Sequence, residues 1–378
     1  MIRDAVIAAY VRSPFTFARK GALASVRPDD LGAHVIRALL SRTGVDGSEI
    51  EDVVWGCAFP EGEQGLNIGR VVGLRAGLPV STAGMTVNRW CGSSIQAVQA
   101  ACGMILMGAG VAYIAGGTES MSRVPMMGYN ILPPPTWSAD EVSDFINVGL
   151  TAERVAREHG ISRDEQDAFA FKSHSKAFAA RADGRLSAEV APIEVNGGTV
   201  AEDGCIRDTT LADLGTLKTV FLKDGTVTAG SSSPMTDGAT ALLVCTPAFV
   251  ESRGLVPLAR VAGFAVSGCE PGVMGLGPIE SSRKAVKRAG LKIDDIDIVE
   301  MNEAFASQAE ACRRQLDIDP ARLNIDGGAI ALGHPLGATG GRLVGKAATL
   351  LKREGKRYAL ATQCIGGGMG IAMVLEAA

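Results

Sequence analysis

The sequence has few of the residues that mark metal proteins and disulfide scaffolds. It contains 8 cysteines and 4 histidines in 378 residues, and no two cysteines stand in a C-x-x-C spacing. Zinc fingers, zinc ribbons and thioredoxin-like redox motifs need such spacings, so these classes are disfavoured and no metal site is expected. A cysteine content this low also argues against a disulfide scaffold and indicates a reducing compartment.

A large charge of either sign is absent as well. The chain has 37 basic and 41 acidic residues, a net charge of −4. This balance gives no basis for binding nucleic acid or an anionic membrane surface. The first fifteen residues lack the apolar segment of a signal peptide, and the terminal LEAA is no retention signal. We therefore expect a cytoplasmic protein.

One long uncharged run does occur, at residues 92–118. Five glycines and two glutamines interrupt it, which does not suit a membrane span. The pattern predicts a buried helix at 95–107, a glycine turn, and a buried strand at 111–115.

Two common catalytic signatures are missing. No G-x-S-x-G elbow occurs, so a serine hydrolase is disfavoured. The string GGGMG at 366–370 is followed by only eight residues, too few for the helix of a dinucleotide-binding unit. This loop is therefore expected to contact something other than a pyrophosphate.

Glycine is abundant instead: 47 of 378 residues, about 12% against a usual ~7%. Strand and helix patterns alternate along the chain, which predicts an α/β fold with a largely parallel sheet. Strands are predicted at 5–11, 53–59, 85–91 and 239–245, and helices at 28–44 and 69–77.

The second half of the chain repeats the pattern of the first. Residues 281–305 match 35–59 in their order of basic helix, glycine, acidic turn and strand, and residues 324–363 match 85–118. Residues 120–236 are richer in proline and charge. The predicted domains are 1–119 with 237–250, an inserted loop domain at 120–236, and 251–378.

Cys91 and His334 are the first candidates for chemistry. Cys91, in NRWCGSS (88–94), precedes a predicted helix, whose N–H groups and dipole would favour a thiolate. The alternative is a small buried cysteine. Six glycines surround His334 in GGAIALGHPLGATGG (327–341), as suits a general base beside a nucleophile. Core positions are predicted for Cys57, Cys102, Cys245 and Cys312, and surface or boundary positions for His34, His159 and His174.

Two further motifs lie at predicted strand ends. Cys364, in ATQCIGGGMG, stands before a glycine loop in a predicted hairpin. Asn302 and Glu303, in MNEAFA, could cap the next helix, or the Asn302 amide could hold a water against a developing oxyanion.

Together these motifs resemble the thiolase family over nearly the whole chain. The family fold implied is a five-layered αβαβα sandwich, built from two duplicated α/β halves with an inserted loop domain. The matching strings are NRWCGSS (88–94), GGTESMS (116–122), GLTAE (149–153), DGTVTAGSSS (224–233), DGA (237–239), MGLGP (274–278), NEAFA (302–306), GGAIALGHPLGATG (327–340) and CIGGGMG (364–370).

The resemblance implies thiolysis of a 3-ketoacyl-CoA by coenzyme A, or the reverse condensation. Cys91 would be the nucleophile that carries the acyl group, and His334 its base. Cys364 would be the second acid and base. The resemblance assigns one oxyanion to His334 and a water on Asn302, and another to the N–H groups of Cys91 and Gly366.

Coenzyme A is expected as a substrate that binds the inserted domain, with no tightly bound cofactor. By the same resemblance its contacts are Ser233, Arg207, Met274 and Phe305, although the segment around Arg207 is one residue shorter than usual. The expected partners are 3-ketoacyl-CoA and coenzyme A, with no nucleic acid and no membrane. A homodimer or homotetramer is expected.

Several functions stay open at this point. The strings at 88–97, 122–128 and 150–170 resemble the degradative branch of fatty acid β-oxidation more than the acetoacetyl-specific one. The alternatives are a biosynthetic acetyl-CoA acetyltransferase and a non-catalytic scaffold. A decarboxylating ketosynthase would need a second histidine at Asn302. Trp90 and Val148 depart from the usual family residues, which leaves the preferred acyl chain length open.

Overall fold

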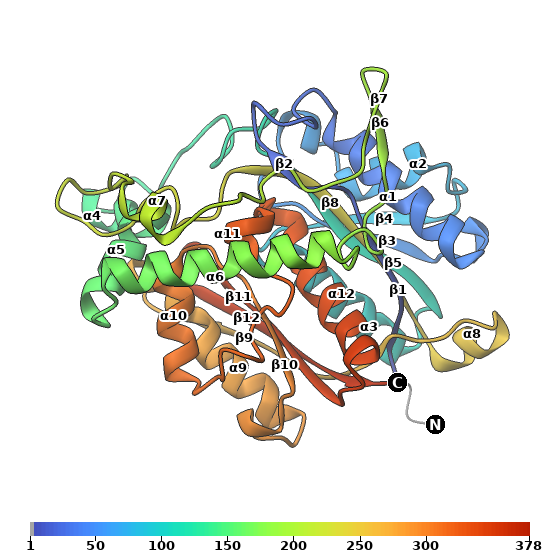
Figure 1. Cartoon of the computed structure of the whole chain (residues 1–378). Helices are drawn as coiled ribbons and strands as arrows, with labels where there is room; N and C mark the ends of the chain where they lie inside the picture. Colours follow the sequence, from blue (N-terminus) through green and yellow to red (C-terminus); the bar gives the residue numbers. More distant parts are fainter. Residues whose placement is uncertain (1–3) are drawn as a thin grey trace.

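A mixed sheet of ten strands runs through the computed structural model of the protein, which describes residues 4–378 (Figure 1). Nine strands lie in the order β4-β3-β5-β8-β1-β9-β12-β11-β10, and β2 pairs with β8. The strands are β1 (Val6–Arg12), β2 (Thr16–Phe17), β3 (Asp52–Gly56), β4 (Ala83–Val87), β5 (Ala112–Ser120), β8 (Thr236–Cys245), β9 (Ala259–Gly268), β10 (Ile298–Met301), β11 (Tyr358–Ile365) and β12 (Met369–Ala377), with β6 (Ile193–Val195) and β7 (Gly198–Val200) in a separate hairpin.

Twelve α-helices of the described chain accompany the strands. They are α1 (Pro28–Thr43), α2 (Ile68–Ala76), α3 (Ser93–Met107), α4 (Ala139–Ile146), α5 (Val148–Glu158), α6 (Arg163–Ala182), α7 (Leu211–Gly215), α8 (Pro247–Ser252), α9 (Gly277–Arg288), α10 (Ala306–Gln315), α11 (Ala329–Leu332) and α12 (Leu336–Glu354). The predicted helices agree with α1 and α2 to within one residue at each end. Strand β9 has no counterpart among the predicted elements.

The duplication predicted from the sequence is visible in the strand pairings. In the first half β3 is parallel to β5, β5 antiparallel to β8, and β8 antiparallel to β1. In the second half β10 is parallel to β11, β11 antiparallel to β12, and β12 antiparallel to β9. The same order and directions recur, so each half folds as one copy of the same unit.

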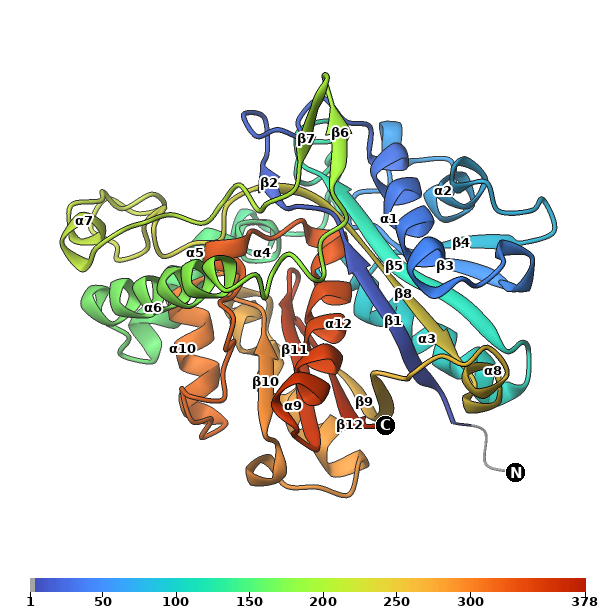
Figure 2. The same cartoon turned by 45° about the vertical axis from the view of Figure 1, so that its right-hand side comes forward.

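Five layers follow from the packing of helices on these two units. Helices α3 and α12 lie between them and contact strands of both, within one large apolar cluster (Figure 2). Helices α1 and α2 cover the outer face of the first unit, and α9 and α10 that of the second. The predicted αβαβα sandwich is confirmed. The two units also join edge to edge, where β1 pairs briefly with β9.

The expectation of a largely parallel sheet is wrong. Most ladders are antiparallel, because β8 enters between β1 and β5 and runs against both. The loop between β11 and β12 spans only Gly366–Gly368, and so short a connection can join only antiparallel strands. The alternation of helices and strands did not reveal either feature.

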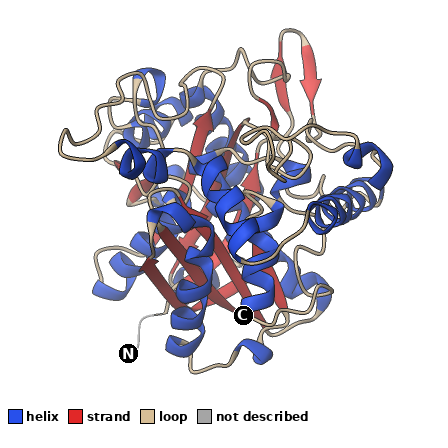
Figure 3. Ribbon diagram, turned by 90° about the vertical axis from the view of Figure 1, so that its left-hand side faces the viewer, coloured by secondary structure: helices blue, strands red, loops and turns tan. Residues whose placement is uncertain are grey.

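The chain leaves the first unit after β5 and returns at β8. This segment carries α4 to α7, and its longest helix, α6, packs against α10 and α11 of the second unit. The β6–β7 hairpin projects from the top of the molecule (Figure 3). Between residues 4 and 378, no helix is both long enough and apolar enough to cross a membrane.

Candidate functional site

The predicted site residues meet in one cavity of about 430 Å³, although they come from distant parts of the chain. Its remaining walls are mainly apolar. Asn302 does not line the cavity, but its side-chain amide contacts the ring of His334, which does. The predicted residues that line it are Cys91, Ser233, Arg207, Met274, Phe305, His334, Cys364 and Gly366.

Cys91 lies in a tight turn between β4 and α3. Strand β4 ends at Val87, earlier than the predicted 91, because Trp90 takes a left-handed backbone conformation with φ 43°. Helix α3 then begins at Ser93, two residues after Cys91. The side-chain amide of Gln363 on β11 donates to the Cys91 carbonyl, which ties this turn to the second unit.

The local environment keeps the Cys91 sulfur protonated at rest. Its side chain faces the cavity and is otherwise enclosed, and this burial raises the pKa of the thiol to about 11. The backbone N–H of Gly366 opposes the rise in pKa, whereas the Glu119 carboxylate adds to it. The predicted effect of the helix N-terminus is thus outweighed by burial. A base must remove the proton before the sulfur can attack.

His334 is a neutral imidazole at the start of α12. The backbone N–H of His334 donates to the Thr236 hydroxyl at 3.0 Å. In the ring, Nδ1 lies 2.6 Å from the Thr339 hydroxyl and Nε2 lies 3.3 Å from the Asn302 amide nitrogen. Burial, together with a smaller contribution from the Arg342 cation, lowers the pKa of His334 to about 3. At neutral pH the resting ring is therefore unprotonated, with a lone pair on one of its two nitrogens.

Asn302 stands at the end of β10 and is buried. Its backbone N–H donates to the carbonyl of Thr362 at 2.9 Å. Its Oδ1 atom has no hydrogen-bond partner within the described chain. The alternative of a helix cap is wrong, because α10 begins at Ala306, its N-cap residue is Phe305, and no side chain caps it.

Cys364 lies near the end of β11, fully buried beside the cavity. Burial raises the pKa of its thiol well above the ordinary value, and the neighbouring Cys91 raises it further. The hairpin predicted here is confirmed by the pairing of Cys364 with Gly370. A side chain at Gly366 would meet the Trp90 ring at 2.6 Å, so only glycine fits where the loop passes the indole.

Glu119 is a buried residue next to the site that the sequence analysis did not single out. It is the next-to-last residue of strand β5 and accepts hydrogen bonds from the backbone N–H groups of Ala58 and Gly337 at 2.8 and 2.9 Å. Phe59 N–H and the Gln64 amide also donate to it, at 3.3 and 2.7 Å. One carboxylate thus holds the loop after β3 against the loop that carries His334.

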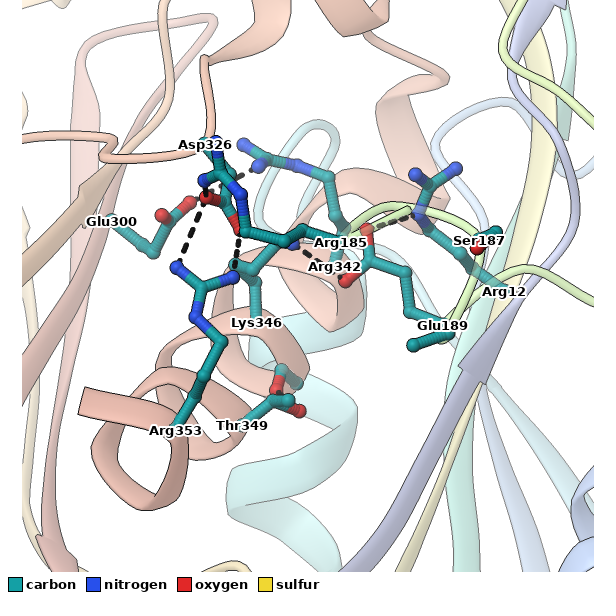
Figure 4. Close-up of polar contacts among 12 residues, drawn as sticks. Arg12, Arg185, Ser187, Glu189, Glu300, Asp326, Arg342, Lys346, Thr349 and Arg353 are labelled. Carbon is teal, nitrogen blue, oxygen red and sulfur yellow. Dashed lines mark hydrogen bonds and ion pairs between the residues drawn. The ribbon is translucent and has the colours of Figure 1, made fainter. Parts of the chain in front are cut away.

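A buried ionic network anchors helix α12 (Figure 4). Arg342 pairs with Glu300 at 3.0 Å, and Lys346 pairs with both Glu189 and Asp326 at 3.0 Å. Removing one partner from such a buried pair typically costs about 3–5 kcal/mol. The network therefore fixes the helix that follows His334 against the inserted segment and β10. It also includes Arg12, Arg185, Asp203 and Arg353.

The residues expected to contact coenzyme A also line the cavity. Arg207 is exposed, with its guanidinium over the Phe17 ring. The Ser233 hydroxyl donates to a carbonyl of the NEAFA segment at 3.1 Å. Met274 and Phe305 are buried in the apolar wall. The lining of the cavity thus includes a cation and a hydroxyl beside apolar side chains that pack with Cys364.

His174 corrects another expectation, because it is buried on α6 rather than at the surface. Its Nδ1 accepts the backbone N–H of Arg207 at 3.2 Å, so the ring must be neutral at this nitrogen. Burial lowers the pKa of His174 to about 4, and the Arg207 cation contributes. The four core cysteines are buried as predicted.

We expect His174 to make the fold sensitive to acid. Its pKa is lower in the folded chain than in the unfolded one, so this contribution to stability is complete above pH 6.5 and is lost as the pH falls toward 4. The loss is about 3 kcal/mol in the free energy of unfolding. Denaturant unfolding across this range should show a shallower pH slope for His174→Gln than for wild type. His159→Gln, at a half-buried position, is the control; equal slopes in all three proteins would contradict the prediction.

Family models match the chain across both units. A model described as Thiolase, N-terminal domain, matches residues 5–248, and one described as Thiolase, C-terminal domain, matches residues 255–377. The chain belongs to the thiolase family.

Relatives of this thiolase match it from end to end. A 3-ketoacyl-CoA thiolase of Bacillus subtilis is 45% identical over 99% of this chain and 100% of its own length. One from Colwellia psychrerythraea is 43% identical over the same shares. The crystal structure of human mitochondrial 3-ketoacyl-CoA thiolase in complex with CoA superposes with a TM-score of 0.92 at 38% identity. That match covers 100% of this chain and 98% of the human one.

The thiolase cavity contains no further titratable cluster that would suggest a metal. Among the described residues of this thiolase, no group of three or more His, Cys, Asp or Glu side chains could hold a metal ion. The groups available for chemistry are therefore two thiols, one imidazole, one amide and backbone N–H groups.

Proposed function

We infer that this thiolase is an acyltransferase that cleaves 3-ketoacyl-CoA with coenzyme A, giving acetyl-CoA and a shortened acyl-CoA in fatty acid β-oxidation. One observation carries the inference. The cavity brings a thiol, a neutral imidazole and a second thiol together in a chain that matches 3-ketoacyl-CoA thiolases over its full length. The chemistry is reversible, so the same groups serve the condensation.

In the first half-reaction Cys91 is the nucleophile. His334 Nε2 takes the thiol proton, and the sulfur attacks the 3-keto carbon. The bond between C2 and C3 then breaks, and its electrons pass to the enolate of acetyl-CoA. Cys364 gives its proton to that enolate and becomes a thiolate, while the acyl group stays on Cys91 as a thioester.

In the second half-reaction the Cys364 thiolate takes the proton of coenzyme A. The new thiolate attacks the acyl carbon on Cys91, and acyl-CoA leaves. The released Cys91 thiolate recovers its proton from His334. His334 returns the proton that it took from Cys91, and the thiol proton of coenzyme A replaces the one that Cys364 gave to the enolate, so the cycle closes without another reactant.

Two oxyanion sites serve these steps. The acyl carbon is bonded to Cys91, so its tetrahedral oxyanion forms beside the N–H groups of Cys91 and Gly366. The enolate oxygen lies toward His334, and the free carbonyl oxygen of Asn302 is available to orient a water there. Removing one such donor typically costs about 10²–10³ in rate.

The proposed domains are a first half at 1–119 with 237–250, an inserted domain at 120–236 and a second half at 251–378. Coenzyme A is proposed to enter the cavity past the inserted domain. Arg207 supplies a cation for the nucleotide phosphates, and Ser233 a hydroxyl beside the pantetheine. Met274 and Phe305 line the channel that leads to Cys91 and Cys364. Coenzyme A acts here as a substrate, and the mechanism uses no tightly bound cofactor.

The acyl chain is proposed to occupy the arm of the cavity beside Cys91. That arm is lined by Phe59, Trp90, Met121 and Leu336, an apolar set that favours an unsubstituted hydrocarbon chain. Each buried methylene is worth about 0.8 kcal/mol, a factor of about four in binding. A charged chain end would be buried there without a partner.

The test is the chain-length profile of thiolysis. We expect kcat/KM to be lowest for acetoacetyl-CoA and to rise as the 3-ketoacyl chain lengthens toward 3-ketohexadecanoyl-CoA. We expect it to fall by about tenfold or more for an ω-carboxylated analogue of equal length. Chromatography of the acetyl-CoA formed measures this. Activity on acetoacetyl-CoA alone would favour the biosynthetic acetyltransferase, and none on any substrate would favour a non-catalytic scaffold.

A homodimer or homotetramer is proposed as the assembled form. Strand β4 is an edge strand with one unpaired side, and apolar side chains near it are exposed: Leu66 at 92%, Val80 at 82% and Met107 at 87%. A second copy could cover both features. Sedimentation at equilibrium tests this, and a monomer at micromolar concentration would contradict it. A cytoplasmic location is also proposed, supported by eight free cysteines, all within the described chain.

A further inference from the structure

Thr339 lies in the first turn of α12 and is fully buried against His334. Its hydroxyl donates to the carbonyl of Pro335 at 3.0 Å and lies 2.6 Å from His334 Nδ1. A hydroxyl has a single proton to donate. The arrangement that satisfies the Pro335 carbonyl, the hydroxyl and the ring together has the hydroxyl donate to Pro335 and accept from the imidazole. In this arrangement Nδ1 carries the hydrogen.

A second contact points to the same tautomer. The amide nitrogen of Asn302 lies 3.3 Å from His334 Nε2, on the opposite side of the ring. An amide N–H can meet this nitrogen only if Nε2 offers a lone pair. Two residues from different elements thus agree on an imidazole with its hydrogen on Nδ1 and its lone pair on Nε2.

We propose that Thr339 is a positioning residue that holds His334 in the Nδ1–H tautomer, the form that can receive the Cys91 proton at Nε2. The proposal rests on the function inferred above for His334. When the proton moves from Cys91 to Nε2, the contact of Nδ1–H with Thr339 is unchanged, whereas the Asn302 amide gives up its contact with the Nε2 lone pair. Arg342 on the same helix disfavours the imidazolium electrostatically, and the Thr339 oxygen offsets this by accepting from it.

Two substitutions separate the hydroxyl from the shape of the side chain. Thr339→Val keeps the shape and removes the acceptor, whereas Thr339→Ser keeps the acceptor. We expect Thr339→Val to lower kcat/KM by about 10–100-fold, the range seen when a partner that orients a functional histidine is removed. Thr339→Ser should retain kcat/KM within about threefold of wild type.

The tautomer can be read directly from the resting enzyme. Long-range ¹H–¹⁵N spectra of protein labelled at its four histidines report which ring nitrogen carries the hydrogen, and His334→Asn assigns the signal. We expect Nδ1–H in wild type and Thr339→Ser, and Nε2–H or a mixture in Thr339→Val.

The outcomes are distinct. Nε2–H in the wild type would overturn the proposal whatever the activity, and this spectrum needs no variant to fold. Loss of activity in Thr339→Val with Nδ1–H retained would also overturn it, since the role would then be structural. A wild type without thiolase activity but with Nδ1–H that depends on Thr339 would support the positioning and contradict the proposed function.

Discussion

Cys91→Ala should lower the turnover of 3-ketoacyl-CoA by about 10⁶-fold, as is typical when the nucleophile of covalent catalysis is removed. The cavity contains a second thiol, but Cys364 is fully buried, and burial and Cys91 both raise its pKa. In the proposed mechanism Cys364 serves the enolate carbon and not the 3-keto carbon, so it is not expected to replace Cys91 as the acyl carrier. Initial rates, together with mass spectra of the intact protein after exposure to acyl-CoA, measure the effect. Wild type should show one acyl adduct and the variant none.

Cys102→Ala is the matched control for this substitution. Cys102 lies on α3, eleven residues further along, and is buried in the central apolar cluster rather than in the cavity. Its loss should cost some stability but leave the acyl adduct intact. An acyl adduct on Cys91→Ala, or a rate above about one hundredth of wild type, would show that another residue carries the acyl group.

Local signals made much of this thiolase predictable from its sequence. Three short strings of residues each require a particular backbone conformation. They form the turn before Ser93, the glycine loop after Cys364 and the loop of His334. The duplication was also predictable, because each half repeats the same order of helix and strand. These features depend on residues close together in the chain.

The rest depends on contacts between distant residues. Glu119 accepts the N–H of Gly337, 218 positions away, and no local pattern pairs these two residues. The local signals were its place in the string GGTESMS (116–122) and directly after the uncharged run at 92–118, and neither points to Gly337. His174 was predicted at the surface or its boundary because its helix spacing is ordinary, yet it is buried and the chain at Arg207 packs against it. The direction of β8 likewise depends on how the chain returns from that segment.

The resting state of the site explains why two acid–base groups are needed. Burial keeps the Cys91 thiol and the His334 imidazole neutral at physiological pH, so no ion pair is stored between them. The proton is transferred only when a substrate carbonyl is present to receive the sulfur and an oxyanion forms. The enolate that later departs needs a different proton, and Cys364 is the remaining acid that lines the cavity within the described chain.

Cys364→Ala should therefore lower thiolysis by about 10²–10⁴-fold, the usual contribution of a general acid and base. A selective readout is the exchange of the methyl hydrogens of acetyl-CoA in D₂O, which requires a base at the enolate carbon. We expect this exchange to disappear in Cys364→Ala, while iodoacetamide still labels Cys91. Nuclear magnetic resonance of acetyl-CoA and peptide mass spectrometry measure the two effects.

Cys312→Ala is the control for the acid–base role. Cys312 is also fully buried, in the apolar cluster beneath α9, but it does not line the cavity. Cys312→Ala should keep both the methyl exchange of acetyl-CoA and the rate of thiolysis near their wild-type values.

If Cys364→Ala retained methyl exchange, another base would have to reach the enolate carbon. His334 is the other base that lines the cavity, and it would then have to serve both the sulfur and the carbon. The mechanism with two separate proton carriers would then be wrong, and the imidazole would have to release the Cys91 proton before it accepted one from acetyl-CoA at the same nitrogen.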